Sequence, residues 1–464
     1  MAKTFDVIVL GGGPAGYVCA IRCSQLGLNT AVVERDKLGG VCVNVGCIPS
    51  KALLQSAYLA NTIQHNAKRL GIHVGDVKLD FSAAIKHSRQ VSDQNSKGVG
   101  FLMKKHKVTV IMGTGTLQPG KKVQVDSDTY TARKAIVIAV GTRVKGIPQI
   151  GLEINKTTVI SSDEALFLTE APKTLAIVGA GAVGMEFADI FGAFGSKVTV
   201  VEMLPRALPL EDAESSETIT KVFKKRKIDI LAGATVKSAK VGDNSVTLEV
   251  ETAGSAQTIE AEKVLMAAGR ALNTENVGLE AVGIKLTDAG FIETDADLRT
   301  SVDGYYCIGD IARPPMLAHK GSREGTHVAE VLAGRQPSPI KYDNIPNVTY
   351  CHPEVASIGL TEDQCKERSL DYQVGRFPLT ANGRARAALE TDGFVKIIRD
   401  KKYGEILGAH IVASHASEMI HELVVAREHE YTVEEVDMAV HAHPTLSEAV
   451  AEAVLDSLGR VIHT

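Results

Sequence analysis

The hydrophobic and polar positions of the chain repeat one pattern twice. In the first copy, an apolar run over residues 5–10 leads through glycines into a helical stretch over residues 14–26, and a second apolar run covers residues 30–33. Short apolar runs that end in turn residues are typical of buried parallel strands. The order of strand, helix and strand predicts a βαβ unit with glycines in its first turn.

The same pattern returns in the middle of the chain. An apolar run over residues 175–178 precedes glycines, a helical stretch through Phe194 and a further run over residues 197–201. In both copies an acidic residue ends the second strand and follows the first glycine by 23 positions (34 − 11 and 202 − 179). A single glycine motif is a weak signal, but this spacing found twice predicts two dinucleotide-binding domains.

The residues of these motifs have separate tasks. The first glycine permits a tight turn, the second lets the backbone approach a pyrophosphate, and the third allows close helix packing. The helix N-terminus offers free N–H groups to the phosphates, and the acidic side chain accepts hydrogen bonds from a ribose diol. These residues are Gly11, Gly13, Gly16 and Glu34 in the first copy, and Gly179, Gly181, Gly184 and Glu202 in the second.

The second site is predicted to prefer NAD over NADP. Glu202 would repel a 2′-phosphate, and the three residues that follow it carry no positive charge. Arg206 lies close enough in the sequence that use of NADP stays open.

The remaining pattern indicates how the chain is divided. Further buried strands are predicted over residues 135–141, 264–269 and 305–310, and β-meander strands over residues 121–125 and 245–251. Residues 145–173 are interpreted as a linker because they contain prolines and polar residues. After residues 336–339, strands alternate with helices and predict a separate α+β domain, with strands over 394–398 and 406–412 and helices over 416–428, 433–439 and 446–458.

Composition narrows the function class. The length of 464 residues suggests about three domains, and a hydrophobic content of 44% is enough for several cores. A formal net charge of −4 argues against nucleic acid as the main partner, and no apolar stretch is long enough to span a membrane. The first predicted strand begins soon after Met1, so we expect no signal peptide and a cytoplasmic protein.

Cys42 and Cys47 lie five positions apart, just after the first nucleotide unit. A straight helix would hold their Cα atoms roughly 8–9 Å apart, whereas a disulfide needs about 7 Å or less. A bond between them therefore requires a loop or a distorted turn, which Gly46 and Pro49 permit. Two reduced thiols packed in a core are an equal alternative, and the spacing does not decide between the two.

The motifs resemble those of the flavin-dependent pyridine nucleotide–disulfide oxidoreductases, over essentially the whole chain. The resemblance rests on G-G-G-P-A-G, C-V-N-V-G-C-I-P-S-K, G-A-G-A-V-G-M-E, A-A-G-R, C-I-G-D and H-P-T-L-S-E. It implies an α/β fold with two Rossmann-like domains, for FAD and NAD, with inserted β-meanders and a C-terminal α+β dimerisation domain. The implied segments are an FAD-binding part (1–150), an NAD-binding domain (151–271), a central region completing the FAD site (272–340) and an interface domain (341–464).

The resemblance also implies roles for individual residues. Lys51 would lie near the flavin, where the family pairs it with the residue that matches Glu186, and Asp310 would bind the ribitol. The implied FAD contacts are Gly11, Gly13, Pro14, Ala15, Gly16, Glu34, Lys51, Gly115, Gly141, Asp310 and Ala318. The implied NAD contacts are Gly179, Gly181, Gly184, Glu186, Glu202, Val236 and Gly269. No metal is expected, because His441 and His443 have no further ligands at metal-binding spacing.

By the same resemblance, Cys42 would form a mixed disulfide with the substrate and Cys47 would face the flavin. A substrate thiol must become a thiolate before it can attack a disulfide. His443 is the candidate base and Glu448 its orienting partner. In the family this histidine comes from the partner subunit, which implies a homodimer.

Within the family, the C-terminal H-A-H-P-T-L-S-E and the I-P-S-K-A-L-L segment look most like the dihydrolipoamide dehydrogenase branch. That branch implies NAD-linked oxidation of protein-bound dihydrolipoamide. The implied partner is the lipoyl-bearing acyltransferase core of 2-oxo-acid dehydrogenase complexes, with the glycine cleavage system as a further setting. Glutathione-reductase-like and mercuric-reductase-like activities are the alternatives.

Overall fold

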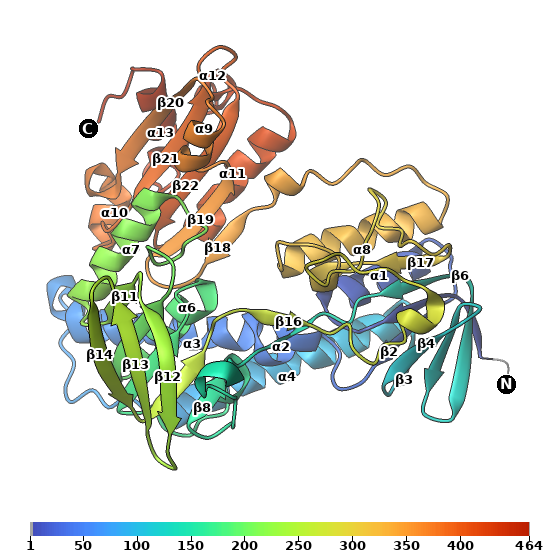
Figure 1. The fold of residues 1–464 in the computed structure, drawn as a ribbon. Helices are drawn as coiled ribbons and strands as arrows, with labels where there is room; N and C mark the ends of the chain where they lie inside the picture. The colour runs from blue at the N-terminus through green and yellow to red at the C-terminus, as the bar shows by residue number, and fades with distance from the viewer. Residues whose placement is uncertain (1–2, 464) are drawn as a thin grey trace. The chain divides into compact units, whose positions relative to one another are not determined.

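The computed structural model describes residues 3–463, which divide into two compact units (Figure 1). Within the described residues, the first unit holds residues 3–52, 85–145 and 269–340, and the second holds residues 53–84, 146–268 and 341–463. None of the helices in this part of the chain has the length and apolar character needed to cross a lipid bilayer.

The first unit is built on a seven-stranded sheet with the path β3-β2-β1-β6-β5-β4, and β17 pairs with β6. The parallel part consists of β1 (Thr4–Leu10), β2 (Thr30–Glu34), β3 (Thr109–Met112), β6 (Asp128–Ile138) and β17 (Tyr305–Cys307). The first residues of β6 pair antiparallel with β5 (Lys122–Val125), which pairs antiparallel with β4 (Gly115–Gln118), and the three strands form a meander. The first predicted nucleotide unit and its meander are confirmed.

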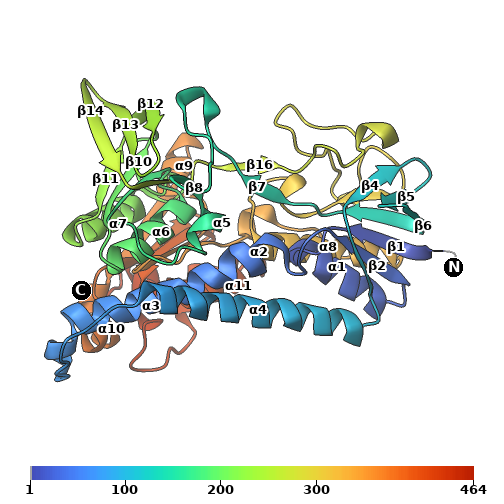
Figure 2. The same ribbon diagram turned by 90° about the horizontal axis from the view of Figure 1, so that it is seen from below.

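Helices α1 (Pro14–Gln25) and α8 (Ala318–Leu332) lie side by side in both views of the fold (Figures 1 and 2). Small residues allow this approach: a Cβ added to Gly325 would lie 2.6 Å from the carbonyl oxygen of Ala15. The other elements of the unit are α2 (Gly40–Val45), α3 (Cys47–His65), α4 (Phe81–Lys105), β7 (Thr142–Val144), β16 (Arg270–Leu272) and the 3₁₀ turn η4 (Gly309–Ile311), and α3 and α4 continue into the second unit.

The second unit contains a parallel five-stranded sheet in the order β11-β10-β9-β15-β8. Its strands are β8 (Val159–Ser161), β9 (Thr174–Val178), β10 (Lys197–Glu202), β11 (Asp229–Ala232) and β15 (Lys263–Met266). Helices α6 (Ala182–Ala193) and α7 (Ala213–Lys225) connect them, and β12 (Thr235–Val241), β13 (Val246–Thr252) and β14 (Ser255–Ala261) form an antiparallel meander. The second predicted nucleotide unit is also confirmed.

The linker predicted over residues 145–173 was wrong in its middle part. Residues Val159–Ser161 form the edge strand β8 of the parallel sheet, and the short helix α5 (Ser162–Ala165) follows with a capping box between Ser161 and Glu164. An apolar run of three residues is too short to be recognised by periodicity, so its pairing with β15 is a tertiary effect.

The C-terminal part of the second unit is an antiparallel sheet in the order β18-β19-β22-β21-β20. The strands are β18 (Asn347–Thr349), β19 (Glu354–Gly359), β20 (Tyr372–Pro378), β21 (Phe394–Asp400) and β22 (Ile406–Ala413). The helices are α9 (Glu362–Glu367), α10 (Gly383–Ala388), α11 (Ala416–Glu428), α12 (Val433–Asp437) and α13 (Glu448–Ser457). The predicted α+β domain is confirmed.

The two faces of this C-terminal sheet differ because successive strand residues point to opposite sides. One face supplies apolar residues to a core that it shares with α11 and α13. On the opposite face, each of the five strands contributes one polar residue, and these residues lie side by side across the sheet. We call this set the polar row. In register across the sheet, the polar row consists of Asn347, Ser357, His410, Lys396 and Arg376.

Candidate active site and nucleotide sites

The first nucleotide turn joins β1 to α1 and has the geometry that its glycines predict. Gly11 adopts φ +109°, a conformation that L side chains rarely take, and a Cβ at Gly16 would collide with the carbonyl oxygen of Gly11. At Gly13, the N-cap of α1, an added Cβ would have its nearest neighbour 3.9 Å away. The start of α1 therefore faces open space with uncapped N–H groups, a cradle that a phosphate fits.

The second nucleotide turn, between β9 and α6, repeats this geometry. Gly179 adopts φ +106°, and a Cβ at Gly184 would collide with the carbonyl oxygen of Gly179. A Cβ added to Gly181, the N-cap of α6, would have no heavy atom within 4 Å. This turn also presents a helix N-terminus to an open space.

The two acidic residues are held in the same way. The N–H of Gly12 donates to Glu34 at 2.7 Å, and the N–H two residues after Glu34 donates to its other oxygen at 2.8 Å. Glu202 accepts the equivalent bonds from Ala180 at 2.7 Å and from the N–H two residues on at 2.8 Å. Each carboxylate is thus fixed beside its glycine turn and keeps lone pairs for a ribose diol.

Other candidate FAD residues gather at the carboxyl edge of the first sheet. Asp310 follows β17 and accepts a hydrogen bond of 2.8 Å from the hydroxyl of Thr142. Gly141, which follows β6, adopts φ +65° and would leave an added Cβ in open space. Gly115 lies in β4, where a Cβ would come within 2.5 Å of Leu10 Cδ1, so its small size also serves packing.

The remaining candidates are spread over several elements. Pro14 and Ala15 form the first turn of α1, Ala318 begins α8, and Lys51 is half-buried in α3. Gly269 adopts φ +106° just after β15, whereas Val236 is buried in the meander core. Glu186 is buried in α6, and its carboxylate accepts a hydrogen bond of 3.1 Å from the N–H of Tyr350.

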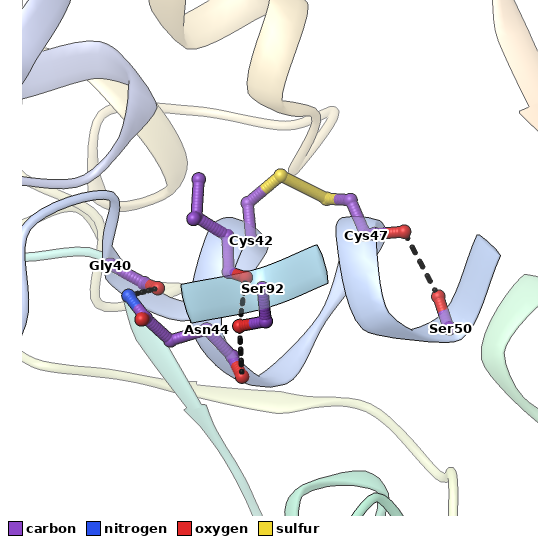
Figure 3. The surroundings of a disulfide bond; sticks show 7 residues. Gly40, Cys42, Asn44, Cys47, Ser50 and Ser92 are labelled. Atoms are coloured by element: carbon purple, nitrogen blue, oxygen red, sulfur yellow. Dashed lines mark hydrogen bonds between the residues drawn. A yellow bond between two sulfur atoms is a disulfide. The ribbon is translucent and has the colours of Figure 1, made fainter. Parts of the chain in front are cut away.

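Cys42 and Cys47 form a disulfide, which decides between the two alternatives that their spacing left open. Helix α2 ends at Val45, Gly46 leaves the helical conformation, and α3 begins at Cys47 (Figure 3). The break brings the two Cα atoms to 4.6 Å, well within disulfide range. The expected distorted turn is present.

Polar contacts hold the helix that carries Cys42. The hydroxyl of Ser92, in α4, donates to the carbonyl oxygen of Val43 at 2.8 Å, and the Asn44 amide donates to that of Gly40 at 2.9 Å (Figure 3). Ser92 is fully buried, so these contacts fix the disulfide segment against α4.

A cleft of about 790 Å³ in the first unit opens beside the disulfide. Cys42 lines it and Cys47 does not, so the two sulfurs are not equivalent. The lining comes from α1, α2, α3, α4 and α8 and includes Tyr17, Ile48, Asn95, Phe101 and His319.

His443 and Glu448 form a pair at the start of α13. Nδ1 of His443 lies 2.7 Å from Oε1 of Glu448, and the N–H of Thr445 donates to Oε2 at 2.7 Å. Partial burial works against the charge of Glu448, but these hydrogen bonds hold its pKa below the usual range. The His443 side chain is 80% exposed, so the ring presents its other nitrogen to the surroundings.

His441 has a different environment. Its Nε2 lies 3.0 Å from the carboxylate of Glu422, and its Nδ1 lies 3.1 Å from the carbonyl oxygen of Ala439. The hydrogen bond with Glu422 raises the pKa of His441 despite partial burial. Both ring nitrogens are engaged, which makes His441 a structural residue.

A buried ion pair at the C-I-G-D turn was not predicted from the sequence. The Lys320 ammonium donates to the carbonyl oxygens of Gly309 at 2.9 Å and Arg313 at 2.8 Å, and Glu324 accepts from the N–H of Gly309 at 2.7 Å. The side chains of Lys320 and Glu324 are fully buried and lie 3.2 Å apart. A Lys–Glu pair four residues apart is common on exposed helices, so only the fold shows that this one supports the turn before Asp310.

Comparison with known proteins agrees with this geometry. Residues 5–325 match the family profile described as pyridine nucleotide-disulphide oxidoreductase, and residues 345–454 match the dimerisation domain of the same family. The dihydrolipoyl dehydrogenase of Rhizobium etli is 45% identical over 485 aligned residues, covering all of both chains. That of Corynebacterium glutamicum is 43% identical, again over the full length of both.

A solved structure extends the comparison to three dimensions. The crystal structure of LpdA from Mycobacterium tuberculosis superposes with a TM-score of 0.89 at 27% identity. The match covers 98% of this chain and 99% of that one.

Proposed function

Because the chain belongs to the pyridine nucleotide-disulphide oxidoreductase family, we propose that it oxidises protein-bound dihydrolipoamide to lipoamide and reduces NAD⁺ to NADH. The observation that carries the proposal is the Cys42–Cys47 disulfide, which lies after a dinucleotide fingerprint and beside a cleft. The chain is a flavoprotein oxidoreductase that uses FAD and NAD.

The open glycine turns fit the two nucleotides. The first turn would hold the FAD pyrophosphate, with Glu34 on the ribose and Asp310 on the ribitol, and Lys51 near the ring. The second turn would hold NAD⁺, with Glu202 on its ribose. Bound FAD would act as the electron carrier, which takes two electrons from a dithiol and passes them on as hydride.

The cysteines would divide the thiol chemistry between them. A substrate thiolate attacks the Cys42 sulfur, and the Cys42–Cys47 bond breaks so that Cys47 leaves as a thiolate. The second substrate thiolate then attacks the substrate sulfur of this mixed disulfide, which releases lipoamide and the Cys42 thiolate. The substrate loses two electrons and the enzyme disulfide gains them. The cleft beside Cys42 supports this order.

His443 would accept the proton of the substrate thiol. Glu448 fixes the ring through Nδ1 and leaves the other nitrogen free to act as the base. The chain carries the family's dimerisation domain and forms a homodimer. We propose that the partner subunit's His443 completes each active site.

The ion pair of Arg206 supports NAD over NADP. Its guanidinium lies 3.1 Å from the carboxylate of Asp363 in α9, so this cation, four positions after Glu202, has another partner. A 2′-phosphate would therefore meet Glu202 without this cation.

The partner of the homodimer is proposed to be the lipoyl-bearing acyltransferase core of a 2-oxo-acid dehydrogenase complex, and glycine cleavage is a further setting. The full-length similarity to dihydrolipoyl dehydrogenases supports this. We also propose a cytoplasmic location, because the five other cysteines are buried and free, as is usual in a reducing compartment.

A substrate panel tests the proposed reaction. The holoenzyme should oxidise dihydrolipoamide with NAD⁺ far faster than it reduces glutathione disulfide or Hg²⁺ with NADPH. Measurement of initial rates at one enzyme concentration compares the three reactions. Faster turnover with either NADPH substrate would contradict the proposal and favour a glutathione-reductase-like or mercuric-reductase-like enzyme.

Serine variants test the division between the two thiols. Cys42→Ser should keep a long-wavelength absorption band, because the Cys47 thiolate would stay beside the flavin. Cys47→Ser should lack that band, and both variants should lose dihydrolipoamide oxidation. Visible spectra of the purified variants give the answer, and a band that persists only in Cys47→Ser would reverse the assignment.

His443→Gln tests the proposed base. General base catalysis typically contributes about 10²–10⁴-fold, so turnover with dihydrolipoamide should fall by that amount while FAD stays bound. Steady-state rates and the flavin spectrum measure the two effects. His441→Gln is the matched control and should retain most activity, whereas full activity in His443→Gln would exclude the proposed role.

A further inference from the structure

A buried cation of the C-terminal sheet is connected to the second glycine turn through residues 208–214, which we call the anchor segment. This segment covers the end of the connection from β10 to α7 and the first two residues of α7. The N–H of Leu208 donates to the carbonyl oxygen of Ala180 at 2.8 Å, and Ala180 belongs to the glycine turn. The hydroxyl of Ser216, in the first turn of α7, donates to the carbonyl oxygen of Leu208 at 3.2 Å. The start of α7 and the glycine turn are thus linked through one residue.

Lys396 of the polar row holds the other end of the anchor segment. Its ammonium lies 3.0 Å from Oδ1 of Asp212 and 2.8 Å from the carboxylate of Glu362. The side chains of Lys396 and Asp212 are 5% and 1% exposed. Asp212 is also the N-cap of α7, because Oδ1 accepts the N–H of Glu214 at 3.1 Å.

The charges of this pair are matched. Burial disfavours the ammonium, but the carboxylates of Glu362 and Asp212 outweigh it and raise the pKa of Lys396. Burial likewise opposes the charge of Asp212, yet His410 and Lys396 lower its pKa. Lys396 is therefore a cation at neutral pH, and its removal would leave a buried carboxylate without its countercharge.

Two further members of the polar row contact the same segment. The amide of Asn347 donates to Glu211, and the guanidinium of Arg376 forms an ion pair with Glu214. Three strands of the C-terminal sheet therefore hold residues 211–214, which form a continuous stretch at the start of α7.

We propose that Lys396 is a positioning residue for NAD⁺, because it fixes the anchor segment and thereby the glycine turn that receives the pyrophosphate. The inference rests on the proposed binding of NAD⁺ at the second glycine turn. Lys396 touches neither nucleotide nor substrate in this account. Its effect should therefore fall on the binding of NAD⁺ and leave the thiol chemistry of the first unit unchanged.

The test compares Lys396→Met with Lys396→Arg and with Lys225→Met as a matched control. Lys225 joins the other end of α7 to Asp392 of the C-terminal domain at 2.9 Å, but this pair is 67% and 53% exposed. ADP-ribose is the binding probe, because it carries the pyrophosphate and adenosine ribose without a redox-active ring. Calorimetry of the holoenzyme is suitable since the chain has no tryptophan to report binding.

In Lys396→Met, we expect KM for NAD⁺ and Kd for ADP-ribose to rise about tenfold while kcat stays within about twofold. Lys396→Arg should recover most of the affinity, and Lys225→Met should behave like the natural protein. Unchanged ADP-ribose binding in a folded Lys396→Met protein would overturn the proposal. So would a loss of FAD, kcat and thermal stability in parallel with KM, which indicates a merely structural role.

Two further variants keep the test decisive. If Lys396→Met does not fold, the pair D212N/K396M removes both charges and keeps an asparagine N-cap, and the same rise in Kd is expected. Glu202→Ala is the reference for the nucleotide assignment. If Glu202→Ala leaves ADP-ribose binding unchanged, the proposed NAD⁺ site fails. If only Lys396→Met leaves it unchanged, the positioning role alone fails.

Discussion

The two nucleotide modules are the first unit, which carries the Gly11–Gly16 turn, and residues 146–268 of the second unit, which carry the Gly179–Gly184 turn. They share the glycine turn and differ in where the buried cation that stabilises each module comes from. In the first module this cation is Lys320, which lies 11 positions after Gly309 and donates to its carbonyl oxygen, in the turn before Asp310. In the second module the supporting cation is Lys396, which lies 184 positions after its partner Asp212 and comes from the C-terminal sheet. Both cations are buried.

The helices that follow the two glycine turns also differ in whether their contacts lie within the module or with another domain. Helix α1 packs on α8 of its own module through small residues such as Ala15 and Gly325. Helix α6 instead carries Glu186 and Asp189, whose carboxylates accept backbone N–H groups of the C-terminal domain at 3.1 and 2.6 Å.

This difference corresponds to what each nucleotide does in the proposed reaction. FAD remains bound through turnover, and its module has a local framework. NAD⁺ must enter and NADH must leave in every cycle, and its module depends on contacts with a second domain. The same glycine fingerprint can therefore occur in a module stabilised by its own residues and in a module stabilised by contacts with another domain.

The largest effect that would sharpen this comparison is expected from Lys320→Met. Removing one partner of a buried ion pair costs about 3–5 kcal/mol, and here it leaves Glu324 uncompensated beside the turn that carries Asp310. We expect FAD affinity to fall by at least about tenfold, measured by reconstitution of the apoprotein with FAD. Affinity of the remaining holoenzyme for ADP-ribose should stay unchanged.

Arg133→Met is the control for this variant, because Arg133 forms a 2.9 Å ion pair with Asp6 in the same unit but is 58% exposed. Weaker ADP-ribose binding together with normal FAD binding in Lys320→Met would break the distinction between the two modules.

A second prediction concerns Glu211, which is buried in the anchor segment. Burial raises its pKa to about 7 from a usual value of 4.5. The native state therefore holds a proton that the unfolded state has lost, so stability declines as pH rises from 4.5 towards 7 and levels off above it. At about 1.4 kcal/mol for each pKa unit, the loss is on the order of 3 kcal/mol.

Glu211→Gln should remove this part of the pH dependence. Thermal unfolding of the variant and of the natural protein should show a difference that grows in favour of the variant from pH 5 to pH 8. Glu251→Gln, at an exposed ion pair with Lys237, is the control and should show a constant difference. A constant difference for Glu211→Gln as well would mean that Glu211 ionises normally.

The smallest effect is expected from Asp363→Ala, which frees Arg206. An exposed ion pair of this kind is worth up to about 1 kcal/mol, so preference for NADP⁺ over NAD⁺ should rise by no more than about fivefold. The ratio of kcat/KM for the two coenzymes measures it. The double variant R206A/D363A should return the ratio to its natural value, and an unchanged ratio in Asp363→Ala would show that Arg206 does not reach the 2′-phosphate.

Local features of the sequence were sufficient to predict the nucleotide turns. Gly11 and Gly179 adopt a positive φ and directly follow apolar runs. Residue type and spacing along the chain are therefore enough to predict the turn at each of them. The Cys42–Cys47 disulfide was predicted only as one of two alternatives, because its 4.6 Å Cα separation depends on how the chain leaves the helix at Gly46. Strand β8 was missed because a three-residue run has no period of its own.

The sequence by itself determined two βαβ units, their glycine turns and the carboxylates that end their second strands. These depend on neighbours within about two dozen positions, where periodicity and turn chemistry act. Only the tertiary structure decided that Lys320 is buried at the turn before Asp310 and that Lys396 is buried beside Asp212. A lysine in a helix or strand has the same local pattern whether its ammonium meets water or a buried carboxylate, and burial depends on residues far away in the chain.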